Sequence, residues 1–265
     1  MLKALFPIGR ILLALALVLL GLIHLIGGNF PVALLPIPTQ VPQRDWLVLL
    51  MGSSLLLAGL GIGFNWKAAP IACGLGILFG GLALVLHVPL LVRDPFNGNA
   101  WTVLGELLAF SGGMFYVAGC RLPTANTYRL PWQTYGRYLL AAALLMFAIL
   151  HGQYADYIAT LIPAWIPATL FWAYFVGVAF GASALSFTLN RQISLSAGLL
   201  GLMFFGWVLV LHVPRVATKP HSEPEWTSLS VALMMSGICW LLTGSRQQSS
   251  SPVDTLPTSV GHTFY

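Results

Sequence analysis

Long apolar segments alternate with short polar stretches along the whole chain. A helix needs about 20 apolar residues to cross the ~30 Å hydrocarbon core of a bilayer. Segments close to that length are separated by clusters of Pro, Gly, Asn and Arg, which favour turns. They cover residues 10–28, 45–64, 68–92, 101–120, 137–155, 168–189, 193–214 and 226–244. The pattern predicts an all-α integral membrane protein with eight transmembrane helices.

Two stretches of sixteen residues begin and end alike. LHVPLLVRDPFNGNAW ends at Trp101, and LHVPRVATKPHSEPEW ends at Trp226. Shifts of 125 or 127 residues superimpose further pairs, namely Asn65 and Asn190, His87 and His212, Arg10 and Arg137, and His24 and His151. Chance similarity among leucine-rich helices explains repeated Leu and Gly but not repeated His, Trp, Arg and Asn. The chain is therefore expected to be a tandem duplication.

Each repeat would contain four helices, which is an even number, so both repeats would enter the bilayer the same way round. This predicts two parallel-repeat four-helix bundles. The expected domains are a first membrane repeat (1–121), a cytoplasmic linker (122–136), a second membrane repeat (137–245) and a disordered, Ser/Pro-rich cytoplasmic tail (246–265). Residues 1–28 imitate a secretory signal, but no convincing A-x-A cleavage site follows them, so we expect a retained helix.

Composition agrees with a membrane location. Hydrophobic residues make up 58% of the chain and charged residues 7%, whereas soluble domains carry about 25% charged residues. The lipid bilayer is therefore the expected partner. The net charge of +5 does not indicate nucleic acid, because no basic run or aromatic–basic interleaving accompanies it.

The cationic residues fit the positive-inside rule if both termini are cytoplasmic. The residues placed inside are then Lys3, Arg10, Lys67, Arg121, Arg129, Arg137, Arg191 and Arg246, and those placed outside are Arg44, Arg93, Arg215 and Lys219. The inner group is twice as large as the outer group, which predicts this orientation.

Histidines recur towards the outer ends of the first and third helices of each predicted repeat. They are His24 and His87, and then His151 and His212. Ionisable residues in a membrane span usually face the bundle interior or a wet cavity. Neutral imidazole can ligate haem iron or hydrogen-bond a quinone oxygen, so all four are candidate cofactor-binding residues for quinone or haem b. The alternatives are structural hydrogen bonds between helices, interfacial water contacts, proton relay, ligand binding and transport.

Two prolines follow the histidines of the third helices. Pro89 and Pro214 cannot donate a backbone N–H, so the carbonyls of Val85 and Val210 lose their partners and the helices kink. A freed carbonyl near a histidine favours a polar pocket.

Three more residues are candidates for supporting the site. Trp101 and Trp226 begin the following helices, where an aromatic ring is more often an interface anchor than a stacking platform. Glu106 lies inside the fourth helix, and its counterpart in the second repeat is Val231. A contact between Glu106 and His87 is geometrically possible, and the alternative is a carboxylate that extends to the outer surface.

No metal site is predicted, because two histidines lack a third ligand and the three cysteines lack ligand spacing. No catalytic residue can be assigned either, since no catalytic motif is present.

Three stretches resemble the DoxX-like superfamily of four-helix membrane proteins, which includes the DoxD subunit of thiosulfate:quinone oxidoreductase. They are GRILLALALVLLGLIHLIGG (9–28), MGSSLLLAGLGI (51–62) and WTVLGELLAFSGGMFYVAG (101–119). The resemblance implies a redox-associated protein of the bacterial inner membrane with a redox or membrane protein partner. An enzyme of this kind would be a quinone-linked membrane oxidoreductase or a subunit of one. The alternative is a non-enzymatic membrane scaffold, or a small-molecule or proton transporter, whose histidines are structural.

Overall fold

The computed structural model describes residues 4–121 and 131–244. Within these ranges every regular element is helical, and eight helices are long and apolar enough to cross a membrane. The prediction of an all-α membrane protein with eight spans is therefore confirmed. Most of the predicted linker and the predicted tail lie outside the described residues.

The spans follow the predicted segments closely. The first four are α1 (Leu5–Gly27), α2 (Arg44–Gly63), α3 (Ala68–Leu82) continued by η2 (Ala83–His87) and α4 (Val88–Arg93), and α5 (Gly98–Arg121). The next four are α6 (Trp132–Gln153), α8 (Thr169–Thr188), α9 (Ile193–Trp207) continued by η3 (Val208–His212) and α10 (Val213–Thr218), and α11 (Glu223–Leu242). A short helix, α7 (Ala155–Leu161), follows α6. Both α1 and α6 begin five residues earlier than predicted.

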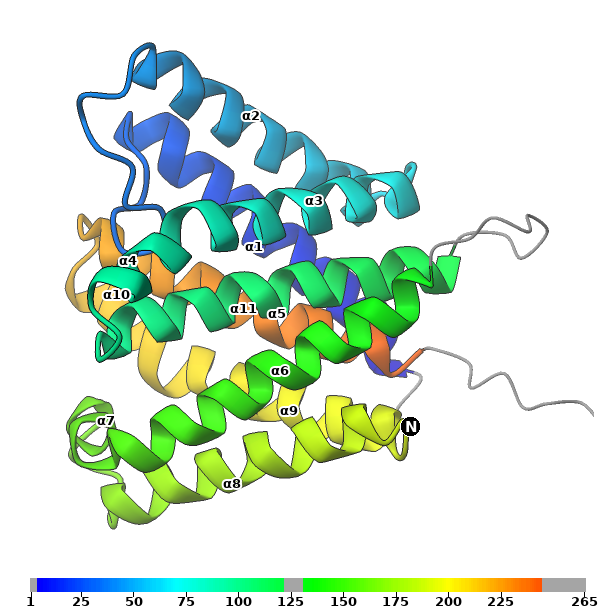
Figure 1. Cartoon of the computed structure of the whole chain (residues 1–265), viewed down its shortest axis with the longest axis vertical. Coiled ribbons are helices and arrows are strands. Elements are labelled where there is room, and N and C mark those ends of the chain that lie inside the picture. Colours follow the sequence, from blue (N-terminus) through cyan, green and yellow to red (C-terminus); the bar gives the residue numbers. More distant parts are fainter. Residues whose placement is uncertain (1–3, 122–130, 245–265) are drawn as a thin grey trace, which may run out of the picture.

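The two groups of four spans are interlocked. α1 packs on α2 of its own group and on α11 of the other group, and α6 packs likewise on α8 and on α5. α5 and α11 contact each other at the centre, with α1, α2 and α3 on one side and α6, α8 and α9 on the other (Figure 1). The first span of each group therefore has the last span of the other group as a main neighbour.

Glycines allow these crossings between the groups. A Cβ atom added to Gly9 would lie 2.7 Å from the backbone nitrogen of Leu241 and 2.8 Å from the carbonyl oxygen of Gly237. A Cβ atom added to Gly112 would lie 2.7 Å from the carbonyl oxygen of Gly136. Small residues let membrane helices approach this closely, which improves their van der Waals packing.

Several hydrogen bonds of the first group of helices recur 125 residues later in the second group. Trp101 and Trp226 donate their indole N–H to the carbonyl oxygens of Pro95 and Pro220, at 2.9 and 2.8 Å. Ser111 and Ser236 donate to the carbonyl oxygens of Gly76 and Gly201, at 2.7 and 2.9 Å. The tryptophans thus fix the turns before α5 and α11, and the serines join α5 to α3 and α11 to α9.

The irregularity expected near each proline takes the form of one π-helical turn. η2 ends at His87 and η3 ends at His212, and Pro89 and Pro214 follow two residues later. The widened turn accommodates the position at which proline offers no N–H. In Figure 1, α4, α7 and α10 all lie at the end of the bundle opposite the N label.

Candidate functional site

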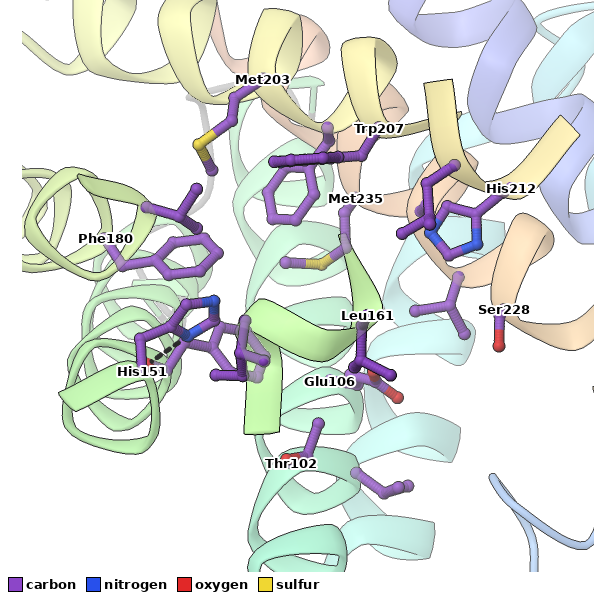
Figure 2. A pocket seen from close by; sticks show the side chains of 18 of the residues that line it. Thr102, Glu106, His151, Leu161, Phe180, Met203, Trp207, His212, Ser228 and Met235 are labelled. Carbon is purple, nitrogen blue, oxygen red and sulfur yellow. Dashed lines mark hydrogen bonds between the residues drawn. The ribbon is translucent and has the colours of Figure 1, made fainter. Parts of the chain in front are cut away.

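A cavity of about 370 Å³ lies among α5, α6, α8, α9 and α11, next to α7 (Figure 2). Its walls are largely apolar and include Phe147, Phe180, Met203, Trp207 and Met235. The volume falls within the range of about 300–1,000 Å³ that is typical of small-molecule sites. Because α7 and the end of η3 border it, the cavity lies towards the bundle end opposite the N label of Figure 1.

Three ionisable side chains line this cavity among the described residues. Glu106 comes from α5, His151 from the end of α6, and His212 from the end of η3. Figure 2 shows them around one space, with the hydroxyl groups of Thr102 and Ser228 nearby. A few polar groups converging in a mostly apolar cavity are the usual form of a small-molecule site.

His151 presents a hydrogen-bond acceptor. Its Nδ1 lies 2.9 Å from the carbonyl oxygen of Phe147 and must donate to it, because a carbonyl oxygen only accepts. In neutral imidazole the other nitrogen, Nε2, then carries a lone pair. The ring also packs edge-on against Phe180, with 5.1 Å between the ring centroids. The orientation of His151 is therefore fixed while Nε2 remains available to a ligand.

His212 and Glu106 have unused hydrogen-bonding capacity. In the part of the chain that the structure describes, neither side chain makes a hydrogen bond or ion pair, and Nδ1 of His212 is buried without a partner. An unsatisfied buried polar group costs about 1–3 kcal/mol. Nε2 of His24 and Nδ1 of His87 are also buried without a partner among the described residues, so the cavity, and not the missing hydrogen bond alone, distinguishes His212.

The first pair of histidines has a different environment. His24 and His87 are buried, and neither borders the cavity. His24 Nδ1 donates to the carbonyl oxygen of Leu20 at 2.7 Å, and its ring packs edge-on against Phe30. His87 Nε2 donates to the carbonyl oxygen of Leu34 at 3.0 Å. The connection between α1 and α2 thus packs on both histidines and leaves them enclosed.

The connection between α6 and α8 leaves the second pair accessible. There, the carbonyl oxygen of Leu161 accepts a hydrogen bond of 3.0 Å from Arg215. The residue 125 positions before Arg215 is Leu90, which has no donor in its side chain. The carbonyl oxygen of Leu161, at the end of α7, is thus bonded by Arg215. His212, unlike His87, has no carbonyl partner among the described residues.

The structure does not bring Glu106 to His87 as the sequence suggested. No ion pair joins the two within residues 4–121, and Glu106 instead shares the cavity with His151 and His212. α5 packs on α6 as well as on α3 and η2, and Glu106 lines the cavity that α6 borders. Trp101 and Trp226 do not border the cavity and bond turn carbonyls instead.

Other cavity residues were not singled out from the sequence. Ser228 occupies the position that Val103 has in the first group of helices. This difference between the two groups could have identified Ser228 from the sequence. Trp172 and Trp207 are indistinguishable from other membrane tryptophans by sequence. In the described ranges no group of three or more His, Cys, Asp or Glu side chains is arranged to hold a metal ion.

Comparisons of the chain with protein-family models, with curated proteins and with solved structures found no match. The class that the fold and the cavity define is a multi-pass helical membrane protein with a largely apolar chamber between its helices.

Proposed function

We propose that the protein binds a quinone in this cavity. The observation that carries the proposal is the meeting of Glu106, His151 and His212, from three helices, in a largely apolar space of about 370 Å³. Two of the four candidate histidines, together with the candidate Glu106, thus form one site. The enclosed pair, His24 and His87, has a structural role.

The chemistry of a quinone suits these walls. Its ring is flat and apolar, and it carries two oxygens that accept hydrogen bonds in the quinone and donate them in the quinol. His151 Nε2 can accept from a quinol hydroxyl, and a protonated Glu106 carboxyl can donate to a quinone carbonyl. Phe180 and Trp207 offer aromatic surfaces to the ring.

We extend the proposal to the family, the membrane and the orientation of the protein. The features that recur 125 or 127 residues apart support a tandem duplication of a DoxX-like four-helix unit. The resemblance to DoxX-like proteins supports a location in the bacterial inner membrane, and the distribution of cationic residues supports cytoplasmic termini with the cavity in the outer half of the bilayer. Quinone binding then serves a redox process shared with a protein partner.

Direct binding measurements test this function. The purified protein in detergent is titrated calorimetrically with a short-chain substituted 1,4-benzoquinone. Glu106→Leu should weaken binding of the quinone, and His151→Leu should weaken binding of the corresponding quinol, titrated without oxygen, each about 3- to 10-fold, because a neutral hydrogen bond contributes about 0.5–1.5 kcal/mol. Asp156→Asn is the control, since it removes a carboxylate from an exposed position outside the cavity. Absence of binding to the unaltered protein would refute the proposal.

A visible spectrum distinguishes the alternative ligands and functions. A Soret band that disappears in His151→Ala or His212→Ala would assign haem b to the cavity in place of quinone. A colourless preparation that neither contains nor binds quinone would favour a membrane scaffold or a transporter.

A further inference from the structure

We infer that the ligand of the cavity carries a long hydrocarbon tail, which passes between α8 and α9 towards the lipid. This inference rests on the proposed function, because the head group is taken to be the quinone ring bound near Glu106. It adds the class of quinone, a membrane-resident long-chain molecule, and its route of entry from the side.

The first observation is a groove on the outside of the cavity wall. A space of about 350 Å³ lies along α8 and α9, and apolar or aromatic residues and one glycine line it. Trp165, at its edge, is 72% exposed, and Phe175 on α8 is 48% exposed. In a chain that spans a membrane, the exposed Phe175 faces hydrocarbon, and Trp165, in the connection before α8, suits the membrane interface.

The second observation is that the groove and the cavity share a wall. Trp172 and Val176 on α8 and Met203 and Trp207 on α9 border both spaces. α8 packs mainly on α6, and α9 mainly on α11, so the seam between α8 and α9 is the less tightly packed boundary. Figure 2 shows Met203 and Trp207 on the cavity side of this wall. A molecule seated in the cavity can therefore extend through this seam.

The chemistry of the two spaces differs in the way that a tailed quinone requires. The ionisable side chains Glu106, His151 and His212 border the cavity and none of them borders the groove. The groove therefore offers no ionisable side chain to a ligand, and its only polar side-chain groups are the indole N–H groups of its tryptophans. Hydrocarbon is the matching occupant, and continuity with the cavity favours the tail of the bound ligand over an independent lipid.

One glycine allows a clean test. Gly206 lines the groove, and a Cβ atom added there meets no atom within 4 Å. Gly81 stands 125 residues earlier on α3, away from the groove, and it is equally open. Gly206→Leu would thus fill the groove without a backbone clash, and Gly81→Leu is the matched control.

The experiment compares one quinone ring with and without a decyl chain. Affinities of both compounds are measured for the unaltered protein, Gly206→Leu and Gly81→Leu in the same detergent, so partition of the tailed compound into micelles is common to all three. We expect the unaltered protein and Gly81→Leu to prefer the tailed compound at least tenfold. Gly206→Leu should lose that preference and keep its affinity for the tailless ring.

The outcomes separate the two proposals. If neither compound binds the unaltered protein, the proposed function fails and this inference fails with it. If the tailless ring binds but Gly206→Leu retains the full preference for the tail, only this inference is overturned. A tail bearing a terminal diazirine gives a second measurement that does not depend on a variant. Crosslinks to α8 and α9 would support the tail route, and crosslinks to α2 and α3 would refute it.

Discussion

His87 Nε2 donates a hydrogen bond of 3.0 Å to the carbonyl oxygen of Leu34, a residue 53 positions away in the chain. His212, its counterpart 125 residues later, has no carbonyl partner of this kind among the described residues and borders the cavity instead. Two similar stretches of sequence therefore give one structural histidine and one that is available to a ligand.

This difference predicts opposite effects for the two alanine variants. His87→Ala should lower the free energy of unfolding by about 1–3 kcal/mol, because the buried carbonyl of Leu34 loses its donor. His212→Ala should change stability little but weaken quinone binding. Thermal unfolding in detergent and calorimetric titration measure the two effects. Equal losses of stability in both variants would contradict the assignment of roles.

The close crossing of α5 and α6 predicts a strong effect from a single methyl group. Gly112→Ala should destabilise the protein by about 1–3 kcal/mol, since the added Cβ would lie 2.7 Å from the carbonyl oxygen of Gly136. Gly74→Ala on α3 is the control, because nothing lies within 4 Å of its added Cβ. The control should be neutral or slightly stabilising. Chemical unfolding in mixed micelles compares the two variants.

The serine hydrogen bonds predict equal contributions from α5 and α11. Ser111→Ala and Ser236→Ala should each cost about 0.6 kcal/mol, the average for hydrogen bonds between membrane helices. Ser228→Ala is the comparison, because Ser228 lines the cavity and makes no hydrogen bond within the described residues. Its removal should leave the unfolding midpoint unchanged. A loss confined to one of the two bonded serines would show that the equivalent bonds differ in strength.

The proposed orientation is tested by thiol labelling in intact cells. Trp66 and Phe96 are exposed, by 65% and 88%, in the connections after α2 and after α4. In a background without native cysteines, Phe96→Cys should react with a membrane-impermeant maleimide, and Trp66→Cys should react only after the cells are opened. The reverse pattern would place the cavity in the inner half of the bilayer.

The sequence was sufficient for the spans, and the three ionisable side chains that line the cavity were among its candidates, for local reasons. Apolar length determines a membrane helix, and a histidine or glutamate inside such a helix is conspicuous. The residues that those side chains would contact could not be predicted from the sequence. Glu106 meets histidines from the other group of helices because α5 crosses α6 at a pair of glycines, and glycine spacing does not name its partner helix.

The enclosure of His24 was equally hidden from the sequence. It depends on Phe30 packing on the imidazole ring, and on Arg44, which lies over Phe30 and donates to Asn29 at 2.7 Å. These contacts come from an irregular connection whose path no periodicity predicts. The matching histidines do not by themselves show which pair lines a cavity, because that depends on connections that differ between the two groups of helices.

The interlocked spans also have a consequence for biogenesis. α1 leaves the ribosome well before α11, yet the two are main neighbours and meet at Gly9 and Gly237. The glycine-bearing face of α1 therefore lacks this partner until α11 has been synthesised. Folding then requires closure between two helices far apart in the sequence, and a nascent chain that stops before α11 exposes a helix face that another copy's α11 could occupy.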